Sequence, residues 1–188
     1  TAAHSTLTLA DTNSTEIFEA PGLGSEIGKH PAKVSVTRAE QDGSTWLDAR
    51  HDGYTRGFGL SHRRRLWIAA GGDELRGEDT LLPPGGQAPE TRVSAAAERS
   101  TSLFPWRRGK SKTFAVRFHL HPGVKASLVQ EGTAVLLRLP SGAGWRFRAQ
   151  GGRVSLEDSI YLGTGDMKRT SQIVVSGGVT ATGPRPGA

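Results

Sequence analysis

The stretch Phe114-Ala115-Val116-Arg117-Phe118-His119-Leu120-His121 places an apolar side chain at every second position and ends at Pro122-Gly123. A period of two that is closed by turn formers is typical of a half-buried β-strand. The same period recurs along the chain, at Thr6–Leu9, Lys33–Thr37, Trp145–Arg148, Val154–Leu156 and Ser171–Val175. Turn formers separate these segments, so we expect hairpins, for example Val124–Gln130 with Thr133–Leu139 across Glu131-Gly132.

The composition agrees with a chain of many short strands. Among 188 residues there are 25 Gly and 10 Pro, more turn formers than an average domain has. A single domain of this length with about 10–13 strands is expected to split into two layers. We therefore predict an all-β fold, a large antiparallel two-sheet β-sandwich over residues 1–176, followed by a flexible tail at 177–188.

Helix and loops take the remaining segments. Helix is expected for at most one or two turns around Ala95–Arg99, and loops are expected at Ala20–Pro31, Pro83–Arg92 and Thr101–Lys112. No cysteine is present, which excludes disulfides, thiolate nucleophiles and cysteine-ligated zinc. The longest apolar run has five residues, Leu66–Ala70, so no membrane span is expected. Because the chain opens at Thr1 and its only methionine is Met167, we expect a processed product or an excised domain.

The charge favours acidic partners. Lys and Arg number 24 against 18 Asp and Glu, which gives a net charge of +6. Nucleic acid, anionic polysaccharide and anionic lipid all fit this sign. No zinc finger, helix-turn-helix or RNA-binding aromatic signature is present, so specific nucleic-acid recognition is disfavoured.

The run His62-Arg63-Arg64-Arg65 is the densest basic segment. On a strand, Arg63 and Arg65 would face one side of the sheet, and His62 and Arg64 the other. Arginine binds carboxylate and sulfate in a bidentate manner, so Arg63, Arg64 and Arg65 are candidate substrate-binding residues. The alternative is a solvated polar face of a sheet.

His119 and His121 would lie on the same face of one strand, where two imidazoles can hold a divalent metal. The alternative is that one of them caps the strand end beside Pro122 and the other is solvated. His4 and Tyr54 form another candidate pair, because a phenol and an imidazole together can perform acid–base chemistry. The alternative for Tyr54, which follows Gly53, is a packed turn residue.

These motifs together resemble a known family. Ala3-His4-Ser5-Thr6 is similar to the strand that opens the C-terminal β-domain of heparinase II/III-like polysaccharide lyases. The next signatures of that domain are similar to His51-Asp52-Gly53-Tyr54 and Leu60-Ser61-His62-Arg63-Arg64-Arg65. Further matching segments follow in the same order, at Gly77-Glu78-Asp79, Phe118–Pro122 and Gly144–Phe147. The resemblance covers about Thr1 to Val175.

The resemblance implies a two-domain lyase. Such proteins carry an N-terminal α/α toroid, absent from this chain, and hold an anionic, uronic-acid-containing polysaccharide between the two domains. They cleave it by β-elimination without a required cofactor. His4 and Tyr54 match residues that project into the cleft, so we expect both side chains to be accessible at one edge of the sandwich.

Some relatives hold a structural metal, and His121 or His119 matches one of its ligands. The resemblance implies a further metal ligand two residues after His4, but this chain has Thr6 there. The resemblance also implies a periplasmic or cell-envelope location, and an inactive domain in the absence of the toroid. The alternative function is a non-catalytic carbohydrate-binding or scaffold module with a basic face.

Overall fold

The computed structural model describes residues 1–83, 113–163 and 165–179. It confirms the all-β prediction. In the described part the only helical segments are one turn, α1 (Thr55–Phe58), and a 3-10 turn, η1 (Gln130–Gly132). The described strands are β1 (Leu7–Leu9), β2 (Ile17–Ala20), β3 (Gly24–Ile27), β4 (Val34–Gln41), β5 (Ser44–His51), β6 (Ser61–Ile68), β7 (Leu75–Leu82), β8 (Thr113–His119), β9 (Lys125–Val129), β10 (Ala134–Arg138), β11 (Gly144–Arg148), β12 (Arg153–Tyr161) and β13 (Lys168–Gly178).

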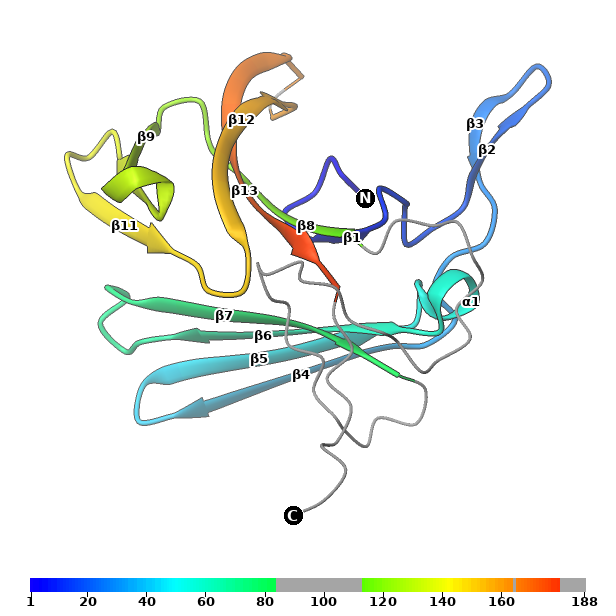
Figure 1. Ribbon diagram of the computed structural model, residues 1–188, viewed down its shortest axis with the longest axis horizontal. Coiled ribbons are helices and arrows are strands. Elements are labelled where there is room, and N and C mark those ends of the chain that lie inside the picture. The colour runs from blue at the N-terminus through cyan, green and yellow to red at the C-terminus, as the bar shows by residue number, and fades with distance from the viewer. Residues whose placement is uncertain (84–112, 164, 180–188) are drawn as a thin grey trace. The chain divides into compact units, whose positions relative to one another are not determined.

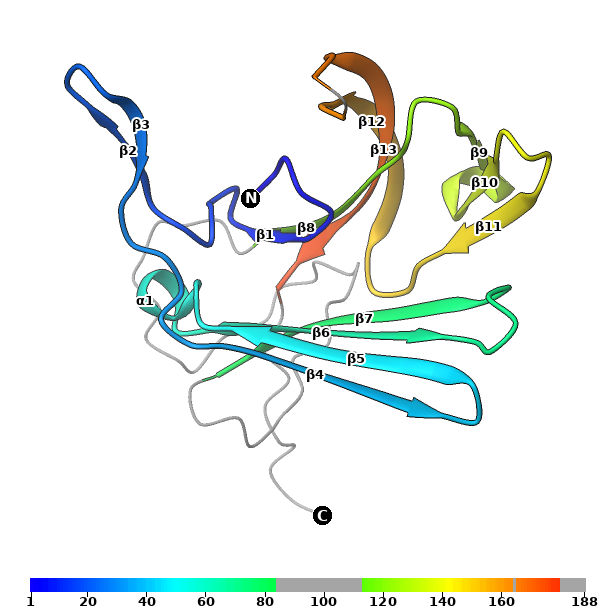
Figure 2. The same cartoon turned by 180° about the vertical axis from the view of Figure 1, so that it is seen from behind.

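The elements fall into two compact units, and every strand pairing in them is antiparallel. The first unit contains β1 and β8–β13. Its larger sheet has the strand order β1-β8-β13-β12, and its smaller sheet has the order β11-β10-β9. Figure 2 shows β10 between its two neighbours. The core of the larger sheet includes Leu7, Leu9, Val116 and Ile173. β1 and β13 each bury three successive residues, whereas in β8 burial alternates. The period of two seen in the sequence is therefore the burial pattern of β8, where Phe114 and Val116 are buried.

The hairpin predicted across Glu131-Gly132 is confirmed. β9 pairs with β10 from Ala134↔Val129 to Arg138↔Lys125. Between them lies η1, where Glu131 has a positive φ of 54° and Gly132 a φ of 88°. A glycine adopts this left-handed conformation without steric cost, so the predicted turn pair is placed where the backbone needs it.

The second unit contains β2–β7 and α1. β4 to β7 form one meander in sequence order (Figure 1). Its register divides the side chains between two faces. We call one the histidine face, which contains Ala49, His51, His62, Arg64, Asp79 and Leu81. We call the other the tryptophan face, which contains Trp46, Asp48, Arg63, Arg65, Trp67, Arg76 and Glu78. The predicted separation of His62 and Arg64 from Arg63 and Arg65 is confirmed.

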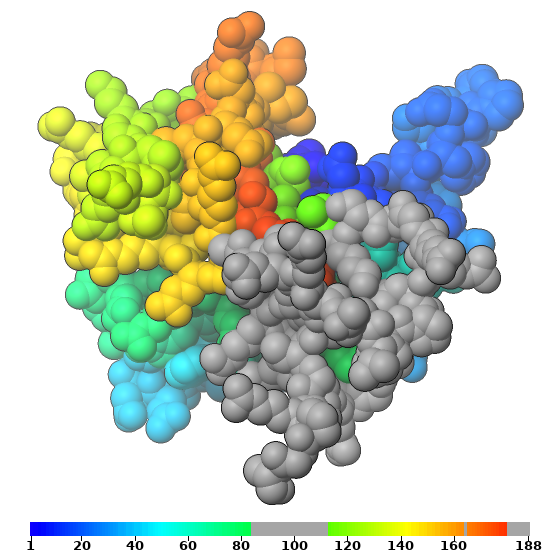
Figure 3. Space-filling model, viewed as in Figure 1, coloured from blue at the N-terminus to red at the C-terminus, as the bar shows by residue number. Residues whose placement is uncertain are grey.

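The expectation of a loop at Ala20–Pro31 is wrong in part, because β3 occupies Gly24–Ile27 and pairs with β2. Gly22 and Gly24, both near φ +80°, form the turn between these strands. The large apolar side chains of this two-stranded hairpin are exposed. Its sequence therefore lacks the alternation of apolar and polar residues that marks a half-buried strand. Figure 3 shows the hairpin, in blue, standing away from the meander β4–β7 of its own unit.

Several predicted segments lie outside the described residues. They include the helical turn at Ala95–Arg99, the loop at Thr101–Lys112 and all but Pro83 of the loop at Pro83–Arg92. β13 continues to Gly178, so the predicted tail begins inside a strand, and residues 180–188 are again outside the description. Among the described helices, none is long and apolar enough to cross a membrane.

Candidate functional site

Two histidines and an aspartate form a hydrogen-bonded line on the histidine face. His51 of β5 and His62 of β6 are direct cross-strand partners, and Asp79 of β7 is diagonal to His62. His51 Nε2 lies 3.1 Å from His62 Nδ1, and His62 Nε2 lies 2.6 Å from Asp79 Oδ1. Asp79 also accepts hydrogen bonds from Arg64, at 2.8 Å and 2.9 Å. We call His51, His62, Arg64 and Asp79 the histidine network.

The protons of the network have one consistent arrangement. The backbone N–H of Gly53 donates to His51 Nδ1 at 3.2 Å, so a neutral His51 carries its proton on Nε2. That Nε2–H donates to His62 Nδ1, and His62 Nε2–H then donates to Asp79. All four imidazole nitrogens are thus used, and an additional proton on either ring would place two donors face to face.

The two residues after His51, Asp52 and Gly53, fix the end of the hydrogen-bonded line at His51. A Cβ on Gly53 would lie 2.6 Å from the carbonyl oxygen of Ser14, so only glycine allows this close approach. The side chain of Asp52 accepts the backbone N–H of Lys33 at 3.1 Å. These contacts tie the end of β5 to neighbouring backbone and direct Gly53 N–H toward His51.

Burial and charge determine the ionisation of the network. Burial lowers the pKa of His51 to about 4, and a charge on His62 would lower it further. Burial alone would raise the pKa of Asp79, but the hydrogen bonds from His62 and Arg64 outweigh that effect and hold the pKa below its usual range. His51 is therefore a neutral imidazole at neutral pH, and Asp79 is a carboxylate that is paired with Arg64.

The free energy of unfolding is expected to fall by about 1–2 kcal/mol between pH 6.5 and pH 4 because of His51. In this range the unfolded chain, with an ordinary pKa of 6.5, binds a proton that the folded chain does not bind. The full pKa shift corresponds to about 3 kcal/mol, but His51 is only partly buried, so solvent screens its charge and lowers this contribution. Urea unfolding at several pH values measures the slope.

His51→Gln removes the titrating group and should flatten the dependence between pH 6.5 and 4, whereas His30→Gln, at an exposed position, should retain it. Below pH 4 both variants should lose the contribution of Asp79, whose stabilisation disappears as pH falls through its lowered pKa. An unchanged slope in His51→Gln would show that another group causes the effect.

The expectation that Tyr54 is solvent-accessible is wrong. Its side chain is 1% exposed, and its ring packs against His51 at 5.7 Å between centroids and against Phe58 at 6.3 Å. Tyr54 stands at the N-terminus of α1, directly after the Gly53 turn, which directs its ring inward. Burial agrees with the packed-turn alternative. Tyr54 and His4 belong to different units, so their expected approach to one edge stays a prediction.

The three arginines of the basic run are paired with carboxylates. Arg63 forms a bidentate contact with Asp48 that includes a 2.9 Å bond, and Arg64 contacts Asp79. Arg65 pairs with Glu78. The acids lie 13 to 15 residues away along the chain, on the neighbouring strands. The run is thus a row of cross-strand ion pairs, and an anionic ligand would have to compete with these carboxylates.

His4 is exposed and belongs to a hydrogen-bonded turn before β1. Its N–H donates to Thr1 at 3.0 Å, and its carbonyl accepts the N–H of Thr6 at 2.8 Å. The segment is also tied to the end of β8, because Ala2 and Ser5 both bond to His119. The N-terminal histidine is therefore held next to a strand end with its side chain accessible.

The expectation that His119 and His121 share one strand is wrong, because β8 ends at His119. His119 donates from Nε2 to the carbonyl of Ala2 at 3.0 Å and accepts at Nδ1 from Ser159 at 2.7 Å. His121 lies in the following turn, where its Nδ1 accepts the N–H of Gly123 at 3.1 Å. His121 is therefore the histidine that caps the strand end beside Pro122. His119 is hydrogen-bonded to Ala2 and Ser159 and is not the solvated histidine of that alternative.

These bonds occupy ring nitrogens that a metal would need. Within the ranges that the structure describes, no three His, Asp or Glu side chains are grouped so as to hold a metal ion. A divalent metal on His119 would have to displace the bond to Ala2 or to Ser159.

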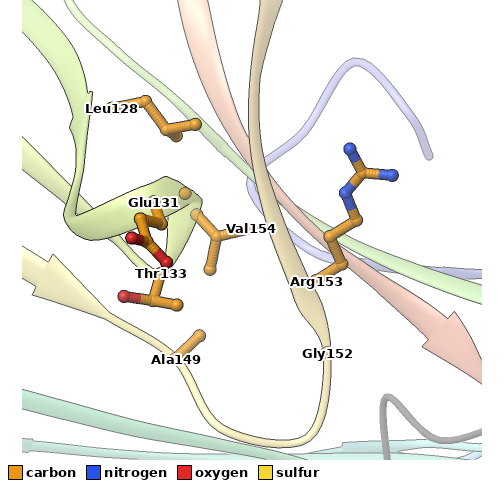
Figure 4. A pocket seen from close by; sticks show the side chains of 8 residues that line it. Leu128, Glu131, Thr133, Ala149, Gly152, Arg153 and Val154 are labelled. Atoms are coloured by element: carbon orange, nitrogen blue, oxygen red, sulfur yellow. The ribbon is translucent and has the colours of Figure 1, made fainter.

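A pocket of about 370 Å³ opens in the first unit, between η1 and β12. Figure 4 shows Val154 pointing into it and the guanidinium of Arg153 pointing away. Glu131 and Arg153 are the charged residues of the lining, which is otherwise small or apolar, for example Leu128 and Ala149; because the guanidinium points away, the carboxylate of Glu131 is the charge at the opening. This lining does not favour an anionic sugar.

Comparison with known proteins identifies the family. The model of the family described as "Heparinase II/III-like, C-terminal" matches residues 1–185. The chain belongs to this family. The resemblance seen in the sequence is thereby confirmed over nearly the whole chain.

The chain is also similar to two known proteins. FtsZ-localized protein C of Caulobacter vibrioides (strain NA1000 / CB15N) is 39% identical over 158 residues, which are 84% of this chain and 25% of the relative. The crystal structure of a mutant of the heparan sulfate lyase HepC from Pedobacter heparinus is similar with a TM-score of 0.58 at 13% identity, over 96% of this chain and 22% of that one. The latter supports the fold alone. The chain spans about a quarter of each relative.

The histidine network was only partly visible in the sequence of this family member. His51, His62 and Asp79 all lie in segments that carry the resemblance, but sequence reasoning gave a role to Tyr54 and the arginines instead. The feature that could have shown it is the alternation of side chains between the two faces of each strand. Once β5, β6 and β7 are paired in a meander, His51 and His62 must share a face with Asp79.

Proposed function

We propose that this chain is the C-terminal β-domain of a polysaccharide lyase that acts on a uronic-acid-containing, anionic polysaccharide of the bacterial cell envelope. Family membership over residues 1–185 supports the class. The observation that carries the assignment of a site is His4, an exposed imidazole held next to the end of β8. An accessible imidazole is suited to acid–base chemistry near neutral pH.

In the proposed reaction the C5 proton of a uronate is removed by a base, and its electron pair forms the C4–C5 double bond. The C4–O4 bond breaks, and O4 takes up a proton. His4 would exchange one of these protons, and the remaining groups would come from an N-terminal toroid domain. The burial of Tyr54 is why the proposal assigns this chemistry to His4 and gives Tyr54 a packing role against His51.

A second candidate is a non-catalytic envelope or scaffold domain. The specific observation in its favour is the 39% identity to FtsZ-localized protein C, whose name places that protein at FtsZ. The burial of Tyr54 and the ion pairing of the arginines agree with it. Under this alternative the domain would keep the fold and bind glycan or protein without elimination.

The experiment uses the full-length protein that contains this chain. Incubation with unsulfated and sulfated uronate polymers should produce the ultraviolet absorbance of an unsaturated uronide. The 188-residue chain alone should produce none, because the reaction needs groups from both domains around one sugar ring. Absence of product from the full-length protein on every polymer would favour the non-catalytic alternative, and product from the chain alone would contradict the two-domain proposal.

A further inference from the structure

Two tryptophans are cross-strand partners on the tryptophan face. Trp46 of β5 is directly opposite Trp67 of β6, with ring centroids 6.0 Å apart and planes inclined by 50°. Trp46 is 48% exposed. The next residue in the same row, Arg76 of β7, holds its guanidinium 4.9 Å from the centre of the Trp67 ring. An exposed indole beside a half-buried one, bordered by a guanidinium, is a large aromatic surface in contact with water.

The neighbouring strand leaves this surface open. On β4 the residues of the same face are small, since Ala39 is opposite Trp46 and Thr37 is opposite Asp48. Neither Trp46 nor Trp67 donates its indole N–H to another residue within the described ranges. Two hydrogen-bond donors are therefore available at the edges of the aromatic surface.

Ion pairs flank the aromatic pair. Asp48, Arg65 and Glu78 form the next row of the face. Arg65 pairs with Glu78, and Asp48 pairs with Arg63. Arg76 bonds to Glu74 at 2.7 Å. Each of these guanidinium groups already has its own carboxylate.

The pairing of each arginine with a carboxylate decides between a densely charged and a weakly charged glycan as the ligand. A densely sulfated chain needs unpaired cations, whereas Arg63, Arg65 and Arg76 are each paired with a carboxylate. A pyranose ring instead offers an apolar face of C–H groups to an indole, and hydroxyls that can donate to a carboxylate and accept from a guanidinium. Paired arginines and acids beside an aromatic surface therefore suit hydroxyl-rich sugars with few charges.

We propose that the tryptophan face, centred on Trp46, Trp67 and Arg76, binds an unsulfated glycan chain that carries at most isolated carboxylates. The inference rests on the proposed polysaccharide function for the class of its ligand, and it narrows that class. It places binding on the face of the meander opposite the histidine network and leaves the assignment of His4 unchanged.

The test is affinity electrophoresis of the protein in native gels that contain hyaluronan, dextran or heparin. Hyaluronan, unsulfated with one carboxylate per disaccharide, should retard the wild type, and the retardation should persist at high salt because stacking is not screened. Trp46→Ala and Trp67→Ala should each weaken the binding about five- to tenfold. Trp46→Phe, which keeps a ring, should retain most of it.

Ile68→Ala is the matched control, because Ile68 follows Trp67 on β6, is about as exposed as Trp46 (45% against 48%) and lies on the opposite face. It should bind like the wild type. Circular dichroism confirms that each variant is folded, and a variant that is unfolded is replaced by Arg76→Ala, which should weaken binding as well. Retardation by heparin alone, binding that is unchanged in Trp46→Ala and Trp67→Ala, or a dimer that Trp46→Ala dissociates would overturn the inference.

The two proposals fail separately. If the full-length protein forms no unsaturated product but binds hyaluronan through Trp46, the lyase proposal fails and the glycan face stands. If the protein cleaves a uronate polymer and binding is independent of both tryptophans, the glycan face fails alone.

Discussion

Asp79→Ala is expected to lower the free energy of unfolding by about 3 kcal/mol. The Asp79 side chain is 12% exposed and accepts hydrogen bonds from His62 and from two nitrogens of Arg64. Alanine removes the acceptor of all three bonds and leaves a cation and an imidazole N–H in partly desolvated surroundings. Urea unfolding at neutral pH, followed by far-UV circular dichroism, measures the loss.

The adjacent residue provides the control. Glu78 lies on the opposite face of β7, is 45% exposed and forms the corresponding ion pair with Arg65. Glu78→Ala is expected to change the free energy of unfolding by less than about 1 kcal/mol, as exposed ion pairs usually do. Equal losses in the two variants would mean that the histidine network contributes no more than a surface pair.

His4→Ala is expected to reduce uronate elimination by the full-length protein about 100-fold or more, provided that the lyase proposal holds. A positioned acid or base contributes about 10²–10⁴-fold to such reactions. The side chain of His4 is exposed, and its turn is held by backbone bonds and by the contacts of Ala2 and Ser5 with His119. Alanine therefore removes the imidazole and keeps the anchoring, so the loss should appear in kcat.

Thermal unfolding of His4→Ala should match the wild type, which separates loss of chemistry from loss of fold. His30→Ala, at another exposed histidine, should retain full activity. Activity of His4→Ala within a factor of two of the wild type would remove His4 from the mechanism.

Much of the fold was predictable because burial in a half-buried strand repeats every two residues. Thr6–Leu9 contained β1, and Phe114–His121 contained all of β8 except Thr113. The alternation of side chains along a strand was enough to separate Arg63 from Arg64. The β2–β3 hairpin was missed, since its apolar side chains are exposed on both faces and leave no periodic signal.

The site was less predictable because it depends on register. The partners of Arg63 and Arg64 are Asp48 and Asp79, each 15 residues away, and which acid meets which base is set by strand pairing. A shift of one residue would place Asp79 on the other face. The sequence also could not separate an accessible Tyr54 from a buried one, because a glycine turn can direct the ring either way.

The strand β1 has a consequence for the order of folding. Its partner β8 is more than one hundred residues later in the chain, for example in the bond from Thr8 to Ala115. The meander β4–β7 lies entirely between them in sequence and pairs only adjacent strands. During synthesis the meander can close its hairpins while β8 has not yet been made, whereas β1 must wait with Leu7 and Leu9 uncovered. The opening segment, which carries His4, should therefore be the last part of the first unit to become protected in a refolding experiment that follows amide hydrogen exchange.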